Sequence, residues 1–282
     1  MNFEGKAFVV TGGASGIGRA LVVELMRRGC SVAAADVDMD GLTETAELAR
    51  QTAQGNCRLA TFKLDVAKLE EWQKFQTDVL EEFGSVDGIV NNAGVTVGVR
   101  ADEMTYNDLD FVMGINFYGM VYGTREFLDH LKSRPEAVIA NVSSIFGLFG
   151  VGNQSAYCAS KHAIRGYTAS LAEELRDSNI HVTSIHPGHI GTNIVRNSRP
   201  AEGNDAWEEN ADQKSRFADE FQTRGMDPVQ AANIILKGIK DKNPRIRIGK
   251  DAIWIDRINR FAPNWFAKRF TQKLEQMGQA AE

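Results

Sequence analysis

Short apolar runs alternate with longer amphipathic stretches along most of the 282-residue chain. Runs of this length are typical of strands buried on both faces of a sheet. We predict strands at Lys6–Thr11, Ser31–Asp36, Arg58–Asp65, Val86–Val90, Ala137–Val142, Ile180–Ile185 and Arg245–Ile248. The intervening stretches carry apolar residues at helical spacing, and strands that alternate with helices predict an α/β fold. We expect a doubly wound parallel sheet of about seven strands with helices on both faces.

No linker or change in composition divides this pattern, so we expect one domain over residues 1–282. Two segments stand apart from the alternation. Residues 193–225 are long, polar and acidic, with a few apolar residues, and predict a mobile lid. Residues 250–282 predict a helical C-terminal extension.

A glycine-rich turn joins the first predicted strand to the helix that follows. Gly12, Gly16 and Gly18 lie in this turn, and a second strand completes a βαβ unit. Bare glycine backbone lets N–H groups and the N-terminus of the helix approach a pyrophosphate, as in a Rossmann-like sheet. The simpler alternative is a tight turn that needs small residues.

Asp36 ends the second strand, where a carboxylate can accept hydrogen bonds from an adenosine ribose. A 2′-phosphate at this place would be repelled, and the nearest basic residue is Arg19. The sequence therefore favours NAD over NADP. Asp36 also begins a pattern that resembles a calcium loop, but the residues before it predict a strand and not the helix that such a loop requires. We interpret the neighbouring acids as the capped start of a helix over Met39–Thr52.

Tyr157 and Lys161 are four residues apart in a stretch with helical periodicity, so both side chains leave one face of the helix. A nearby ammonium lowers the pKa of a phenol, which would let Tyr157 exchange a proton with an alcohol or carbonyl near neutral pH. Taken alone, this common spacing favours a half-buried Tyr beside a solvated Lys, and the other motifs of the chain have to support the catalytic interpretation.

Other polar residues follow predicted strands or interrupt apolar runs. Asn116 lies in the apolar part of a helix predicted over Asp108–Leu131, where it either braces neighbouring backbone or holds a water in a proton path. Ser143 and Ser144 follow the fifth strand, at the edge where open α/β sheets bind ligands. His186 and His189 flank the turn at Pro187 and Gly188, and we expect both to line a loop.

Together these motifs resemble the short-chain dehydrogenase/reductase family, in its compact single-domain branch, from about residue 6 to 249. The resemblance implies that Tyr157 is the general acid/base, that Lys161 lowers its pKa and holds the nicotinamide ribose, that Ser144 binds the reacting oxygen, and that Asn116 orders a relay water. Ser144 fits the family spacing better than Ser143. The cofactor-binding residues implied are Gly12, Ser15, Gly16, Ile17, Gly18, Asp36, Asp65, Val66, Asn92, Ala93, Gly94, Tyr157, Lys161, Pro187, Gly188, Ile190 and Thr192.

Composition excludes several other classes of protein. A net charge of −5 does not favour nucleic acid, and the five histidines form no metal-ligand motif. Three scattered cysteines and the lack of a secretory signal predict a cytoplasmic protein. The cysteines show no metal-binding spacing, so we expect no bound metal. Eleven basic residues and several aromatic ones between residues 237 and 273 allow peripheral membrane contact, but we favour packing on the protein or a partner.

The predicted activity is NAD-dependent interconversion of a secondary alcohol and its ketone. Phe146, Leu148, Phe149 and Val151 suggest a hydrophobic or aromatic substrate, or they only pack beneath the lid. The family resemblance implies a homodimer or homotetramer. The alternative function is a regulator or scaffold that binds NAD without turnover, although all four expected catalytic residues are present.

Overall fold

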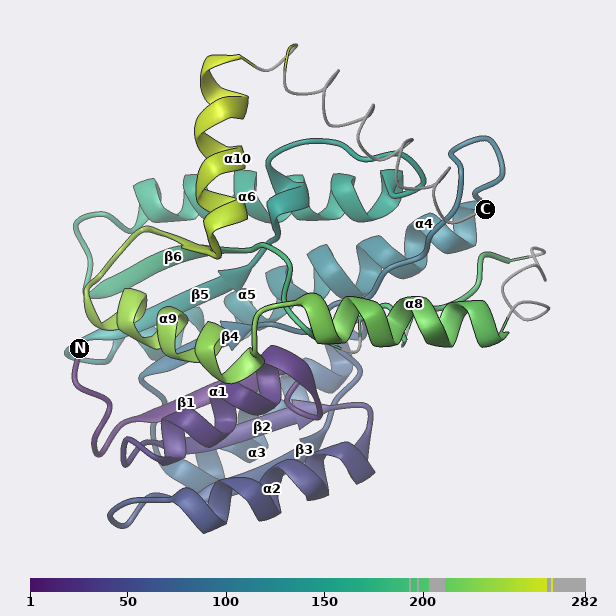
Figure 1. Ribbon diagram of the computed structural model, residues 1–282. Coiled ribbons are helices and arrows are strands. Elements are labelled where there is room, and N and C mark those ends of the chain that lie inside the picture. The colour runs from purple at the N-terminus through teal and green to yellow at the C-terminus, as the bar shows by residue number, and fades with distance from the viewer. Residues whose placement is uncertain (193, 197, 203–210, 263–264, 266–282) are drawn as a thin grey trace.

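The protein is described by a computed structural model that covers residues 1–192, 194–196, 198–202, 211–262 and 265. Seven parallel strands form one sheet in the order β3-β2-β1-β4-β5-β6-β7 (Figure 1). Their bounds are β1 Ala7–Thr11, β2 Ser31–Asp36, β3 Leu59–Lys63, β4 Gly88–Asn91, β5 Ala137–Val142, β6 Ile180–Pro187 and β7 Arg245–Ile248. The predicted fold class is confirmed. The strand order reverses between β1 and β4, the point at which open α/β sheets bind ligands.

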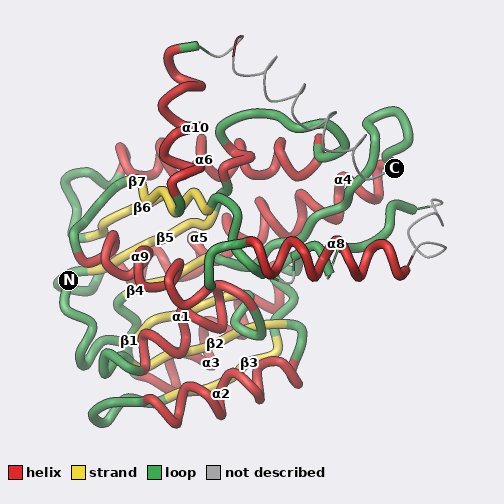
Figure 2. The backbone as a smooth tube through the Cα atoms, in the orientation of Figure 1, coloured by secondary structure: helices red, strands yellow, loops and turns green. Residues whose placement is uncertain are grey.

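Helices cover both faces of the sheet (Figure 2). Their bounds are α1 Gly16–Met26, α2 Met39–Thr52, α3 Leu69–Phe83, α4 Tyr106–Met113, α5 Gly119–Lys132, α6 Ser155–Glu174, α8 Ala211–Arg224, α9 Pro228–Lys240 and α10 Lys250–Phe261. Helices α1, α2 and α9 bury apolar side chains with Phe8 and Val10 of β1, whereas α3, α5 and α6 pack with Val9 on the opposite face. Because side chains alternate along a strand, β1 to β6 supply side chains to both cores, whereas β7 supplies Ile246 and Ile248 to the core of α1, α2 and α9.

A π-helical turn, Gly114–Tyr118, separates α4 from α5. The sequence predicted one continuous helix here, so this prediction is wrong in detail. Asn116 lies within the turn and is 1% exposed. The extra residue in a π turn re-aims side chains, and such turns are frequent at functional sites.

Helix α10 confirms the helical start of the predicted extension, and its first half packs on the domain. Ala252 and Ile255 are buried against Ile145, Leu148 and Phe149. Residues 203–210 of the predicted lid, and 263–264 and 266–282 of the extension, lie outside the described residues. Among the described helices, none is both long and apolar enough to span a bilayer.

Candidate active site

Four strands bring the predicted motifs to one edge of the sheet. The glycine turn follows β1, Asn92 to Gly94 follow β4, Ser143 and Ser144 follow β5, and Pro187 ends β6. All four strands run parallel, so these segments gather at the carboxyl edge.

The glycine turn is shaped by backbone that other residues do not adopt easily. Gly12 and Gly16 have φ angles of +67° and +54°. A Cβ on Gly18 would overlap the carbonyl of Gly12, and one on Gly16 would lie 3.1 Å from Cγ2 of Thr192. The turn therefore packs too tightly for side chains at these positions, and the segment after β6 lies against it at Thr192. Tight glycine turns of this kind precede the helix N-terminus in dinucleotide-binding sheets.

Thr11 joins the ends of β1 and β4, a role that the sequence did not predict. Its hydroxyl oxygen accepts hydrogen bonds from the backbone N–H groups of Asn92 at 3.0 Å and Ala93 at 3.1 Å. The Asn92 amide donates in return to the carbonyl of Thr11 at 2.9 Å. The segment Asn92–Gly94 is thereby held against the glycine turn.

The Asp36 carboxylate lies beside the glycine turn. Its Oδ2 accepts a hydrogen bond from the Ala14 N–H at 3.0 Å, and its Oδ1 accepts one from the Asp38 N–H at 3.1 Å. Asp38 in turn caps α2 by accepting from the Gly41 N–H at 3.0 Å. The acids of the calcium-like pattern thus bind backbone, and the predicted helix cap is confirmed.

Arg19 is committed within the protein. Its guanidinium donates to the carbonyl of Ala14 at 2.6 Å and pairs with Glu44 at 2.8 Å. It also donates to the hydroxyl of Thr45 at 3.0 Å. The basic group nearest to Asp36 in sequence is therefore already bound by acceptors of α2 and of the turn.

Asp65 and Val66 follow β3, and both contact other residues of the protein. Asp65 Oδ1 accepts from the Ala67 N–H at 3.1 Å. The Val66 carbonyl accepts from the indole N–H of Trp72 at 3.0 Å, and its side chain lies against Gly119. Their cofactor contacts stay a prediction.

Tyr157 and Lys161 lie one turn apart on α6 and are buried, at 8% and 3% exposure. Lys161 Nζ is 5.5 Å from the centre of the Tyr157 ring and donates to the carbonyl of Val142 at 3.0 Å. A Cβ on Gly94 would lie 3.2 Å from Lys161 Nζ and 3.3 Å from Asn116 Oδ1. Gly94 therefore lets the segment after β4 pass directly over the ammonium.

Burial controls the charges of this pair. It raises the pKa of Tyr157 to about 12, although a hydrogen bond with Ser144 acts in the opposite direction. It lowers the pKa of Lys161 to about 8. The expected lowering of the Tyr157 pKa is therefore wrong for this arrangement, because desolvation outweighs the favourable interactions while Lys161 is bound to Val142.

The two serines after β5 have different partners. The Ser143 hydroxyl donates to the carbonyl of Lys161 at 2.7 Å and is thus used to hold α6. The Ser144 hydroxyl accepts from the Phe146 N–H at 3.1 Å and interacts with Tyr157. Of the two, Ser144 lies beside the phenol, in agreement with the choice made from spacing.

Asn116 braces the backbone after β4. Its Oδ1 accepts from the Val95 N–H at 2.8 Å, and its amide donates to the Val95 carbonyl at 3.0 Å and to the Ser160 hydroxyl at 2.9 Å. The bracing alternative is confirmed by these contacts. A role in holding a relay water stays a prediction.

The segment after β6 folds back over the site. Gly188 N–H donates to the carbonyl of Ile248 at 2.9 Å, and Thr192 N–H donates to that of Ile190 at 2.8 Å. Ile190 is buried and forms a β-bridge with Met226. This anchoring places Thr192 against the glycine turn.

Comparisons with known proteins agree with this geometry. A model of the short chain dehydrogenase family matches residues 6–203. The chain belongs to the short-chain dehydrogenase family. It is 36% identical over 263 residues to a Mycobacterium tuberculosis oxidoreductase named SadH, which covers 92% of this chain and 91% of that protein. It is 33% identical over 197 residues to levodione reductase of Leifsonia aquatica, covering 70% and 73%.

Solved structures agree with the fold of this short-chain dehydrogenase. A short-chain dehydrogenase/reductase from Burkholderia phymatum in complex with NAD superimposes with a TM-score of 0.81 at 26% identity, covering 92% of this chain and 94% of that one. A crystal structure of levodione reductase gives a TM-score of 0.78 at 27% identity, covering 89% and 99%.

An apolar wall lies next to the cluster of Ser144, Tyr157 and Lys161. The Phe146 ring is edge-on to Tyr157, with ring centres 6.2 Å apart, and edge-on to Phe149 at 5.6 Å. Helix α10 supports this wall from outside, because Asn259 donates to the carbonyl of Leu148 at 2.6 Å. The sequence favoured packing of the extension on the protein or a partner without specifying the place, and α10 packs on this loop.

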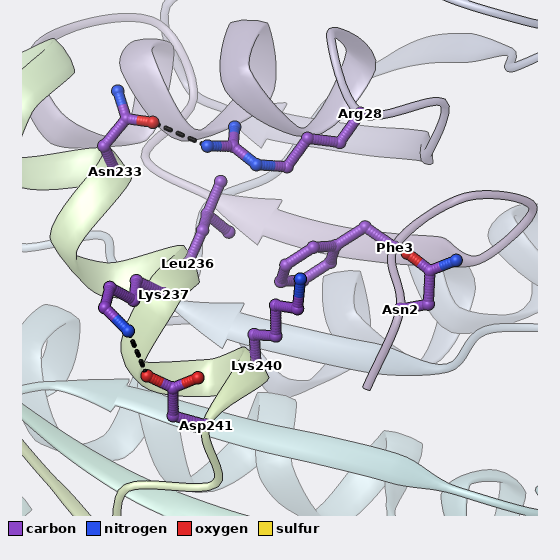
Figure 3. Close-up of a pocket in the computed structure, with 8 residues that line it drawn as sticks. All are labelled: Asn2, Phe3, Arg28, Asn233, Leu236, Lys237, Lys240 and Asp241. Atoms are coloured by element: carbon purple, nitrogen blue, oxygen red, sulfur yellow. Dashed lines mark hydrogen bonds and ion pairs between the residues drawn. The ribbon is translucent and has the colours of Figure 1, made fainter.

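A separate hollow of about 420 Å³ lies at the amino edge of the sheet (Figure 3). It is lined by Asn2, Phe3, Arg28, Asn233, Leu236, Lys237, Lys240 and Asp241. Arg28 pairs with Glu24, and Lys237 pairs with Asp241. The hollow is remote from Tyr157, and its charges are largely used within the protein, so we assign it no part in the chemistry.

Proposed function

We propose that this short-chain dehydrogenase interconverts a hydrophobic secondary alcohol and its ketone with NAD as the cofactor. The observation that carries the proposal is the buried cluster of Ser144, Tyr157 and Lys161 beside a glycine turn. A phenol, a hydroxyl and an ammonium in one dry site are suited to moving a proton at a reacting oxygen.

The residues at the carboxyl edge fit a dinucleotide. Gly12 and Gly18 leave no room for a side chain because the turn packs on itself and on Asn92. A tight glycine turn between a strand and a helix is the arrangement in which backbone N–H groups approach a pyrophosphate. We expect Asp36 to bind the adenosine ribose and Lys161 to bind the nicotinamide ribose. When bound, NAD supplies the nicotinamide carbon that exchanges hydride with the substrate.

The charge at Asp36 supports NAD over NADP. A 2′-phosphate beside this carboxylate would be repelled, and Arg19 is already bound by Glu44 and the Ala14 carbonyl. The Burkholderia phymatum relative in complex with NAD is in line with this choice.

Tyr157 carries its proton at neutral pH, since burial raises its pKa to about 12. In the reductive direction the phenol donates this proton to the carbonyl oxygen, which Ser144 also binds as negative charge develops. Oxidation needs the phenolate, and the Lys161 ammonium stabilises that anion when it turns from the Val142 carbonyl toward Tyr157. The same ammonium can thus serve both directions.

The apolar wall supports a hydrophobic substrate. Phe146 lies against the Tyr157 ring, and Phe149 packs behind it. One relative is named levodione reductase, which is consistent with a ketone substrate. We also propose that the protein acts as a homodimer or homotetramer.

The test is turnover of a panel of hydrophobic secondary alcohols and ketones, with NAD and NADP in parallel. We expect activity with NAD that is lost in Tyr157→Phe, while that variant still binds NAD. Tight NAD binding without turnover of any member would contradict the proposal and favour a regulator that senses the cofactor.

A further inference from the structure

His186 is the penultimate residue of β6 and is completely buried. The sequence predicted that it lines a loop, and this prediction is wrong because β6 continues to Pro187. Its ring lies between two serines. Nδ1 is 3.1 Å from the carbonyl oxygen of Ser144, and Nε2 is 3.0 Å from the hydroxyl of Ser184.

These contacts define the protonation of the ring. A carbonyl oxygen can only accept, so Nδ1 carries the hydrogen and donates it to Ser144. The neutral ring then accepts the Ser184 hydroxyl hydrogen at Nε2. Burial lowers the pKa of His186 to about 4, so the ring keeps this neutral form at neutral pH.

The hydrogen bond from His186 is one of three that hold Ser144 in place. The Ser144 carbonyl also accepts from the Gly147 N–H at 3.0 Å, and the Ser144 hydroxyl accepts from the Phe146 N–H at 3.1 Å. Both lone pairs of the carbonyl are therefore used, one by the turn that follows and one by the neighbouring strand. The Gly147 N–H belongs to the same loop as Ser144 and would move with it. The hydrogen bond from His186 instead links Ser144 to a strand of the rigid sheet.

We propose that His186 is a positioning residue, which holds the Ser144 carbonyl so that the Ser144 hydroxyl points at the oxygen protonated by Tyr157. The inference rests on the proposed function. It assigns a task to a fully buried histidine whose ring nitrogens bond to Ser144 and Ser184.

The first test is the kcat of His186→Ala measured per folded molecule. We expect a fall of about ten- to a hundredfold, since small misplacements of a catalytic group have effects of this size. The dissociation constant for NAD should stay within about twofold of the wild-type value. His181→Ala is the control, because His181 lies on the same strand and contacts the carbonyl of Asn243, away from Ser144.

The second test separates positioning from folding by comparing two amides. Asn at position 186 can place its N–H₂ where Nδ1 lies, whereas Gln reaches toward the place of Nε2. We expect His186→Asn to recover most of the lost kcat and His186→Gln to recover less. These variants remain informative if His186→Ala does not fold.

A double-mutant cycle with Ser144→Ala gives the decisive readout. If His186 acts through Ser144, the kcat effect of His186→Ala shrinks to less than about threefold in the Ser144→Ala background, measured by single turnover at high enzyme concentration. An undiminished effect in that background, or an unchanged kcat in His186→Ala, overturns the inference. An inactive wild-type protein would instead contradict the proposed function itself.

Discussion

The Asp36 carboxylate combines a structural bond with a charge. One oxygen accepts from Ala14 and the other from Asp38, so removing the whole side chain would disturb the turn. Asp36→Asn removes the charge and keeps one of the two acceptor oxygens, so it disturbs the turn less than removal of the side chain. We expect the ratio of kcat/KM for NAD to that for NADP to fall by about tenfold or more, equivalent to about 1.4 kcal/mol.

The control for this prediction is Asp40→Asn, which removes a nearby charge from the first turn of α2. It should leave the cofactor preference almost unchanged. If the ratio of kcat/KM for NAD to that for NADP were the same in wild type and Asp36→Asn, the role given to Asp36 would be contradicted.

Lys161 is expected to lower the stability of the protein while it serves the chemistry. Its pKa is lowered to about 8 from 10.5, so the unfolded chain holds the proton more tightly between these values. Below about pH 8 the folded protein therefore bears the full cost of a buried charge, and its stability rises as the pH increases from 8 toward 10.5.

Lys161→Met should accordingly raise the free energy of unfolding at pH 7. The pKa shift of Lys161 corresponds to about 3 kcal/mol of stability. The variant also loses the hydrogen bond to the Val142 carbonyl, which offsets about 1 kcal/mol of this gain. Urea unfolding at pH 7 and pH 10 measures the gain, which should shrink at the higher pH. Lys74→Met, at a side chain 77% exposed, should show no such gain. A less stable Lys161→Met at pH 7 would contradict this account.

Among single residues, the sequence predicted the members of the candidate site better than the residues that hold them in position. Tyr157, Lys161 and Ser144 could be predicted because their spacing and their place after a strand carry the signal. Thr11 and His186 could not, because their bonds join ends of strands that are distant in sequence. The pKa of Tyr157 was predicted in the wrong direction, since burial is a property of the folded protein.

Helix α10 contributes to the apolar wall beside the site and is also joined to β7, where Arg245 and Arg247 pair with its buried Asp256. Ile255 packs against the loop of Ile145 and Leu148, and Asn259 bonds to the same loop. We expect Ile255→Ala to cost about 2–4 kcal/mol in stability and to raise the KM of a hydrophobic ketone without changing NAD affinity. Chemical unfolding and steady-state kinetics measure the two effects.

Ile253→Ala is the matched control, because Ile253 lies on the same helix and is 36% exposed. It should change neither quantity much. If Ile255→Ala lowered stability but left the KM of every ketone unchanged, α10 would have no part in the substrate site.

The bounds of helices and strands were predicted well where a single local sequence pattern determines them. The bounds of β2, β5 and α2 agree with the predicted ranges because continuous apolar runs mark the two strands and a capping acid marks the helix. The π turn at Gly114–Tyr118 escaped prediction. It accompanies the bonds of Asn116 to Val95 and Ser160, which exist only after folding.

The whole molecule places its chemistry through strand order. β1 and β4 are neighbours in the sheet although two other strands separate them in sequence. This crossover brings the glycine turn beside Asn92, and β5 and β6 add Ser144 and His186. The alternation of strands and helices predicted the doubly wound parallel sheet but not its strand order, and the oligomeric state stays a prediction.

The most direct test of the account follows a label through one turnover. NADH deuterated at the transferring position is mixed with the best ketone, and the alcohol is analysed by mass spectrometry and NMR. We predict deuterium on the carbinol carbon for the wild type and, for Tyr157→Phe, unchanged NADH binding with product formation slowed by about a hundredfold or more. Bound NADH without labelled alcohol, or a fully active Tyr157→Phe, would contradict the proposed mechanism.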